Sequence, residues 1–212
     1  MGNYYIFALG FAAQLFFSAR ILIQWIMSEK AKRVISPSIF WELSILASYM
    51  LFLYGWFRND FAIMLGQVIT YYIYIWNLRE KKDWKKFPAL VHLILNITPI
   101  AGMFYILFHW QLFFSSCFKN ADIPILLLLY GSAGQLIFTL RFVYQYFYSH
   151  KRNESLLPKG FWIISIIGSA TIVSYGILRA DPVIILGQSF GFVSYIRNLI
   201  LLKKSHETNR IQ

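Results

Sequence analysis

The sequence predicts an all-α polytopic membrane protein in which seven transmembrane helices form two parallel three-helix bundles joined by a linker helix, a 3+1+3 arrangement. Three observations lead to this fold class: the composition, an internal duplication and the distribution of Lys and Arg. The 212 residues are 58% hydrophobic, 19% aromatic and 14% charged, whereas a soluble domain is about a quarter charged. A chain of this composition belongs in a bilayer, and little of it is left for a soluble domain.

The duplication relates residues 10–78 to residues 131–199 at a constant offset of 121 positions, without a gap. Roughly two positions in five are identical between the copies. The offset pairs polar residues that lie inside apolar runs: Gln14 with Gln135, Arg20 with Arg141, Gln24 with Gln145, and Gln67 with Gln188. Polar residues retained in both copies of a membrane repeat predict a site between two halves.

Seven segments reach the roughly 20 apolar residues that a spanning helix needs: residues 4–27, 37–57, 61–78, 89–110, 124–148, 158–178 and 182–202. The first has no basic n-region and no cleavage site, so we expect a retained helix and not a signal peptide. Pro37, Pro158 and Pro182 fit the first turn of a helix. The segment 89–110, with Pro99 as its expected kink, is unrepeated and gives both repeats the same orientation.

Lys and Arg alternate between the two sides of these segments. One set of connections carries Lys30, Lys32, Arg33, Arg79, Lys81, Lys82, Lys85, Lys86, Lys151, Arg152, Lys159, Lys203, Lys204 and Arg210, and the other carries Arg58, Lys119 and Arg179. The positive-inside rule then predicts an N-terminus outside, a cytoplasmic C-terminus and an odd number of spans. The net charge of +11 is therefore interpreted as a topology signal and not as nucleic-acid binding, with contact to anionic lipid headgroups as an alternative.

The predicted domains are a first three-helix repeat (1–80), a basic loop with the linker helix (81–121), a second three-helix repeat (122–203) and a cytoplasmic tail (204–212). No catalytic residue, metal site or cofactor is expected. Cys117 is the single cysteine, and the four histidines show no metal-ligand spacing. The only repeated carboxylates, Asp60 and Asp181, are typical of helix N-caps, so no general acid–base pair is evident.

The candidate substrate-binding residues lie inside the predicted spans: Gln14, Arg20, Gln24, Gln67 and Tyr74, with their copies Gln135, Arg141, Gln145, Gln188 and Tyr195. Arg20 and Gln24 share a helix face, as do Gln67 and Tyr74, because they are four and seven positions apart. Buried polar groups of this kind are satisfied by one another, by water or by a ligand.

Alternatives stay open for several of these positions. Arg20 and Arg141 can snorkel to the interface instead of facing inward, and Gln67 and Gln188 can join helices instead of binding a ligand. The repeated serines are expected to form a helix-packing stripe: Ser44, Ser48, Ser165 and Ser169. Gly66 and Gly187 are expected to let a neighbouring helix approach closely. Arg197 corresponds to Trp76 in the first repeat, so the two repeats differ at this position. Arg197 can give the two halves different ligand contacts, or it can snorkel to the interface.

The assembled pattern resembles the lipid-A-biosynthesis N-terminal domain family. It reads GxxxQxxFxxRxxxQ on the first helix, PxxFWxxSxxxS on the second, then YGxxRxD and GQx6YxxNL, and it occurs twice. That family is found alone and joined to lipid-A-disaccharide synthase, a glycosyltransferase. We expect no enzyme here, because this chain lacks the length of the glycosyltransferase.

The units are also similar, more distantly, to the bundles of SWEET and PQ-loop transporters, whose seven-helix members use the same three-one-three plan. Gln24 and Gln145 fall where those proteins carry the Gln of a Pro-Gln pair, and Gln67 and Gln188 fall near their polar binding position. Ile23 and Tyr144 replace the Pro, which departs from proline-hinge gating.

These features favour a transporter or flippase of the bacterial inner membrane that handles a sugar-bearing lipid or lipid carrier linked to lipid A or envelope biosynthesis. The expected partners are membrane lipids and a lipid-linked sugar or sugar substrate, with no nucleic acid. The alternative hypothesis is a non-transporting scaffold or accessory subunit for a lipid A glycosyltransferase of the lipid-A-disaccharide synthase type.

Overall fold

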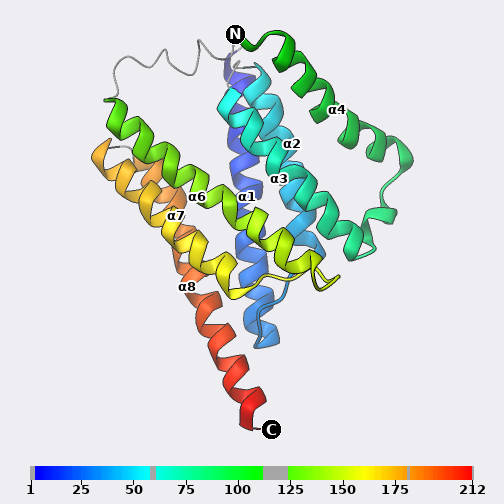
Figure 1. The fold of residues 1–212 in the computed structure, drawn as a ribbon, viewed down its shortest axis with the longest axis vertical. Coiled ribbons are helices and arrows are strands. Elements are labelled where there is room, and N and C mark those ends of the chain that lie inside the picture. The colour runs from blue at the N-terminus through cyan, green and yellow to red at the C-terminus, as the bar shows by residue number, and fades with distance from the viewer. Residues whose placement is uncertain (1–2, 58–60, 112–123, 181, 212) are drawn as a thin grey trace. The chain divides into compact units, whose positions relative to one another are not determined.

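The computed structural model describes residues 3–57, 61–111, 124–180 and 182–211. Within these ranges the regular structure is helical, with seven α-helices and one short 3₁₀ helix (Figure 1). They are α1 (Asn3–Ala31), α2 (Ser38–Phe57), α3 (Phe61–Glu80), η1 (Asp83–Lys86), α4 (Ala89–Phe108), α6 (Ile125–His150), α7 (Lys159–Leu178) and α8 (Pro182–Ile211). Each predicted span corresponds to one of these helices.

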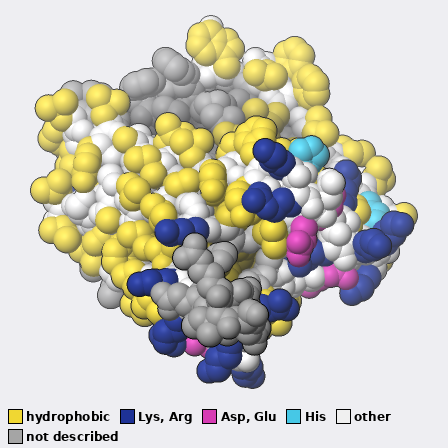
Figure 2. All heavy atoms as spheres, turned by 60° about the horizontal axis from the view of Figure 1, so that its bottom comes forward, with side chains coloured by type: hydrophobic (Ala, Val, Ile, Leu, Met, Phe, Trp, Pro, Cys, Tyr) yellow, Lys and Arg dark blue, Asp and Glu magenta, His cyan; other side chains and the backbone are white. Residues whose placement is uncertain are grey.

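Polar and apolar side chains are distributed as in a membrane protein. Among the described residues, three helices are long and apolar enough to cross a bilayer: α1 from Tyr4 to Ala31, α2 and α7. Large hydrophobic side chains such as Phe11 lie exposed, whereas Arg20 and Gln145 are buried, and Figure 2 shows hydrophobic side chains over wide parts of one face. Because lipid solvates an apolar exterior and polar groups must find partners inside, this distribution confirms a helical membrane-type protein.

The helix ends differ from the sequence prediction in two ways. Helices α2 and α7 begin one residue after Pro37 and Pro158, and Pro158 is the N-cap of α7 and not part of its first turn. Helices α1 and α8 continue beyond their apolar segments, to Ala31 and Ile211. A helix does not have to end where hydrophobicity ends, because its i to i−4 hydrogen bonds join backbone groups and do not require apolar side chains.

The chain divides into two compact units, and the division passes through α1. Unit 1 comprises Met1–Arg20 and Trp41–Asp122, and unit 2 comprises Ile21–Phe40 and Ile123–Gln212. The first part of α1 therefore packs with α2, α3 and α4, and its second part packs with α6, α7 and α8.

In unit 1, the unrepeated helix α4 packs against α2 and α3 through aromatic side chains. The Tyr72 hydroxyl donates to the Asn96 carbonyl over 3.1 Å, and the rings of Trp56 and Tyr105 lie 4.7 Å apart. The absence of a side chain at Gly102 makes room for Phe52, since a Cβ there would come within 2.3 Å of the ring. The second repeat has Val193 opposite Tyr72, Ile177 opposite Trp56 and Val173 opposite Phe52, so it lacks these aromatic partners.

Close helix approaches occur at repeated glycines. A Cβ on Gly10 would lie 2.8 Å from the Tyr54 ring, and a Cβ on Gly131 would lie 2.7 Å from Tyr175, at equivalent positions of the two repeats. The prediction for Gly66 is wrong, because a Cβ there would meet no atom within 4 Å. The surroundings of Gly187 are outside what the structure describes. The residues that the offset pairs thus include real packing contacts, but not at every shared glycine.

Candidate functional site

Arg20 is the centre of a buried polar cluster in unit 1. Its Nη1 donates to the Ser44 hydroxyl over 2.6 Å, from α1 to α2. The guanidinium carbon lies 4.5 Å from the centre of the Phe17 ring and 5.5 Å from that of Tyr74. Trp41 packs on Tyr74 with 6.0 Å between ring centres, and Arg20 is 4% exposed. The side chain therefore lies inside the helix bundle and does not snorkel.

Arg141 makes the equivalent cluster in unit 2, between α6, α7 and α8. Its Nη1 donates to Ser165 over 3.3 Å and to the Tyr195 hydroxyl over 3.1 Å. Trp162 packs on Tyr195 with 6.0 Å between ring centres and 37° between ring planes, against 6.0 Å and 39° for Trp41 and Tyr74. The Phe138 ring faces the guanidinium, with 3.5 Å from the ring centre to its carbon. The duplication thus preserves a three-dimensional site as well as a pattern.

Hydrogen-bond donors are abundant in the unit 2 cluster. A guanidinium carries five N–H groups and no acceptor, and aromatic faces stabilise its charge by about 0.5–2 kcal/mol each. The Trp162 Nε1 is also buried and has no hydrogen-bond partner within the described part of the chain. A cluster of donors around a permanent positive charge is suited to an anionic group such as phosphate.

Gln67 and Gln188 take equivalent places between the second and third helices of their repeats. The Ser48 hydroxyl donates to Gln67 Oε1 over 2.9 Å, and the Ser169 hydroxyl donates to Gln188 Oε1 over 3.2 Å. Both glutamines are half-buried. These bonds agree with the interhelical interpretation, and they use the serines that were expected only to pack.

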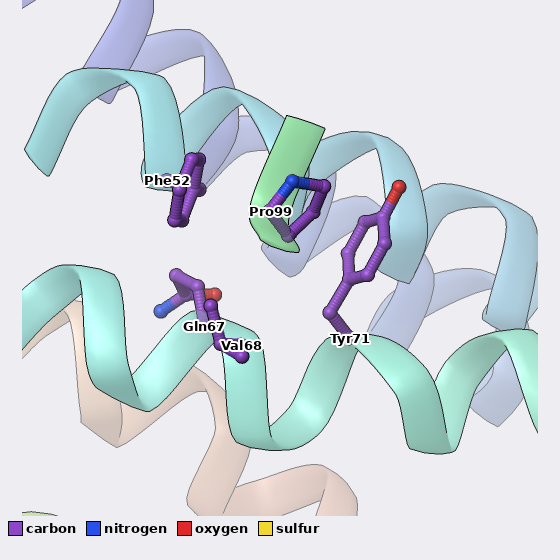
Figure 3. Close-up of a pocket in the computed structure, with 5 residues that line it drawn as sticks. All are labelled: Phe52, Gln67, Val68, Tyr71 and Pro99. Atoms are coloured by element: carbon purple, nitrogen blue, oxygen red, sulfur yellow. The ribbon is translucent and has the colours of Figure 1, made fainter. Parts of the chain in front are cut away.

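Gln67 also borders a narrow gap between α2, α3 and α4. The gap is lined by Phe52, Gln67, Val68, Tyr71 and Pro99. Figure 3 shows the Gln67 side chain pointing from α3 toward Phe52, with Tyr71 and Pro99 beside it. The Tyr71 hydroxyl is buried and makes no hydrogen bond to any described residue.

Gln24 and Gln145 hold the loop that follows the first helix of each repeat. Gln24 Nε2 donates to the Ser28 hydroxyl over 2.9 Å and to the Ile35 carbonyl over 3.2 Å. Gln145 Nε2 donates to Ser149 over 2.9 Å and to the Leu156 carbonyl over 2.9 Å. Ser28 and Ser149 are not among the candidate residues predicted from the sequence, although the offset of 121 pairs them.

The remaining predicted residues lie apart from these contacts. Gln14 and Gln135 are exposed, one turn and a half before the arginine of the same helix. Asp60 and Asp181 lie outside the described residues. Among the residues that the structure describes, no three His, Cys, Asp or Glu side chains gather in a way that would hold a metal ion.

Several loops and the helix ends beside them carry exposed cations. In unit 2 the exposed cations include Lys30, Lys32, Arg33, Lys151, Arg152 and Lys159. In unit 1 Lys86 pairs with Asp83 in η1 over 2.5 Å, and this carboxylate raises the pKa of Lys86. Figure 2 shows dark blue Lys and Arg side chains beside a hydrophobic surface, as expected where helices leave a membrane.

Comparison with known proteins gives a consistent result. The model of the family described as the Lipid A Biosynthesis N-terminal domain matches residues 9–79 and again residues 130–200. The chain is 31% identical over 211 residues to a protein of Chlamydia pneumoniae named lipid-A-disaccharide synthase, covering 97% of this chain and 35% of that protein. It is 30% identical to the protein of the same name from Chlamydia caviae, covering 94% of this chain and 34% of the relative.

A third relative of that name, from Chlamydia felis, is 29% identical, with 94% of this chain and 33% of the relative covered. The chain thus spans about a third of the length of the curated relatives it matches. No solved structure matches the chain. The family match and these relatives associate the chain with lipid A biosynthesis.

Proposed function

The chain belongs to the Lipid A Biosynthesis N-terminal domain family, in two tandem copies, and on that basis we propose that it is an inner-membrane transporter or flippase for a sugar-bearing lipid or lipid carrier of lipid A or envelope biosynthesis. In this proposal seven helices span the membrane in a SWEET-like 3+1+3 arrangement with parallel repeats. The N-terminus is outside, and the basic loops and the C-terminus are cytoplasmic.

The observation that carries the proposal is the buried arginine cluster found once in each repeat. Arg20 and Arg141 occupy equivalent positions, each beside a serine hydroxyl and the face of a buried tyrosine. A guanidinium costs free energy to bury, so retaining one in both halves of an apolar protein favours a functional reason. Guanidinium groups bind phosphate or pyrophosphate oxygens, and Tyr74 and Tyr195 present aromatic faces on which a sugar ring can stack.

The glutamines supply the second part of the proposed site. The oxygen of each amide accepts a bond from Ser48 or Ser169. An amide also carries two N–H donors, which are suited to sugar hydroxyl or phosphate oxygens. In the proposal Gln67 and Gln188 therefore hold polar head atoms while their oxygens keep them attached to the neighbouring helix.

A reconstitution experiment tests this proposal. Purified protein in liposomes is expected to move lipid-linked sugars between leaflets, and the Gln67→Ala/Gln188→Ala double variant is expected to move them at least about tenfold more slowly, since losing a hydrogen bond to a charged group costs about 1.5–3 kcal/mol. Ser189→Ala is the matched control, because this exposed serine adjoins Gln188 and its hydroxyl donates to the Ile185 carbonyl of its own helix. Absence of lipid and sugar movement with the parent protein would overturn the proposal.

The second candidate is a membrane scaffold for a lipid A glycosyltransferase. The names of the relatives favour this role, because these relatives are called lipid-A-disaccharide synthase. A region similar to nearly all of this chain makes up about a third of each relative. In this role the exposed cations of the loops would contact the enzyme or anionic headgroups near it. Cross-linking in native membranes is expected to recover that glycosyltransferase, and recovery of no envelope-biosynthesis enzyme would contradict the scaffold.

A further inference from the structure

Two side-chain contacts in unit 2 join the end of α1 to α8. Arg197 Nε and Nη2 donate to the two carboxylate oxygens of Glu29, with 3.1 Å from Nη2 to Oε2. Gln24 Nε2 donates to Asn198 Oδ1 over 3.0 Å, and Asn198 Nδ2 donates back to Gln24 Oε1 over 3.3 Å. A bidentate ion pair and a reciprocal amide pair hold the end of α1 against the middle of α8, through adjacent residues of α8 and residues five positions apart on α1.

A third contact joins the loop after α1 to the loop between α6 and α7. The Ser36 and Ser155 hydroxyl oxygens lie 3.1 Å apart, and Ser155 is 5% exposed. Ser36 follows α1, whereas Ser155 lies between α6 and α7. Because Ser36 lies five positions after the end of α1, we expect separation of this helix end from α8 to pull the serine pair apart and expose Ser155 to water.

The ion pair is an addition to the repeat and not part of its shared packing. At the same offset, Glu29 corresponds to His150 and Arg197 corresponds to Trp76. Trp25 donates from its Nε1 to Glu29 Oε1 over 3.0 Å and so orients the carboxylate. In the second repeat Tyr146 replaces Trp25. Glu29, Arg197 and Trp25 therefore have no identical residue at the equivalent position of the other repeat.

Its exposure makes this ion pair one that can open. The Glu29 and Arg197 side chains are 29% and 41% exposed, so water can solvate both charges when they separate. The amide pair behind it is buried, since Gln24 and Asn198 are at most 1% exposed. The buried amide pair stabilises the contact between α1 and α8, whereas the exposed ion pair can separate at a low cost in free energy.

We infer that the Glu29–Arg197 ion pair, supported by the Gln24–Asn198 amide pair, is a latch that holds the end of α1 against the middle of α8 and releases when these two helices separate. As a step in transport the latch rests on the function proposed above. The first part of α1 belongs to unit 1, so release of its end from α8 would free one helix that both units share.

The latch is tested by the reactivity of a single cysteine. In full-length protein in lipid nanodiscs, Cys117 is replaced by Ser and Ser155 by Cys, and the rate of alkylation by a hydrophilic maleimide is measured. Glu29→Gln and Arg197→Gln are each expected to raise the rate about three- to tenfold, because local opening exposes residue 155. The charge exchange Glu29→Arg/Arg197→Glu is expected to return the rate to within about twofold of the parent.

Glu154→Gln is the matched control, because it removes an exposed acid from the loop that carries Ser155, and it is expected to leave the rate unchanged. Single variants that react at the parental rate, or a charge exchange that reacts as fast as they do, would overturn the latch. The liposome assay separates the two proposals. Faster alkylation without lipid movement by any variant supports the latch and contradicts transport, whereas lipid movement with unchanged alkylation contradicts the latch alone.

Discussion

Arg141 on α6 donates a hydrogen bond to the Tyr195 hydroxyl on α8 over 3.1 Å. The two side chains are 3% and 2% exposed, so a permanent charge and a hydroxyl meet inside a helix bundle whose exterior is apolar. The same residue types meet in unit 1, where the Arg20 guanidinium lies 5.5 Å from the Tyr74 ring centre. In both repeats a tyrosine on the third helix therefore contacts the buried arginine. We expect substitutions of the arginine or the tyrosine to change the stability of the protein.

Arg141→Lys is expected to lower the free energy of unfolding by about 1–3 kcal/mol, because lysine lacks the planar fork and the stacking of arginine. Tyr195→Phe removes only the acceptor and is expected to cost about 0.5–1.5 kcal/mol. Thermal or denaturant unfolding of the purified protein in detergent measures both. A lysine variant as stable as the parent would contradict the buried cluster.

The Ser48–Gln67 bond is expected to couple α2 and α3 by about 0.6 kcal/mol, the usual value for an interhelical hydrogen bond in a membrane protein. A double-mutant cycle with Ser48→Ala and Gln67→Ala measures this coupling energy. The same cycle on Ser169 and Gln188 should agree, since the bonds are 2.9 and 3.2 Å long. Zero coupling in both repeats would mean that these serines only pack.

Ser28→Ala is expected to loosen the loop after α1, because the Ser28 hydroxyl accepts from the Ile35 backbone N–H over 3.2 Å and from Gln24. Trypsin cleavage after Lys32 or Arg33 should accelerate severalfold, since local opening governs proteolysis. Ser18→Ala, at an exposed position earlier on α1, is the control. Equal cleavage rates for the two variants would count against a structural role of Ser28.

Substitution by alanine is expected to change the free energy of unfolding differently at two glycines, Gly168 and Gly66, which both lie inside apolar helices. A Cβ on Gly168 would lie 2.8 Å from the Phe138 backbone, whereas a Cβ on Gly66 would meet nothing within 4 Å. Gly168→Ala is therefore expected to cost about 1–3 kcal/mol by overpacking, and Gly66→Ala should leave stability unchanged or slightly raised. Unfolding measurements on both variants compare these sites, and equal losses would contradict the described packing.

The sequence by itself determined the helical membrane class, the positions of the helices and membership of the family. These properties follow from hydropathy and from a repeat with a constant offset, and both can be read from residues close together in the chain. The equivalence of Arg20 and Arg141 was visible in the same way, because identical residues at one offset predict identical places in each repeat.

Only the tertiary structure decided which side chains meet. In the structure Gln24 forms hydrogen bonds with the Ile35 carbonyl and with Asn198. Gln14 is exposed, and Glu29 forms an ion pair with Arg197. The tertiary structure also placed the unrepeated helix α4 in unit 1, against α3 through Tyr72. Partners on different helices depend on how side-chain shapes fit across many residues of separation, and no spacing along one helix encodes that fit.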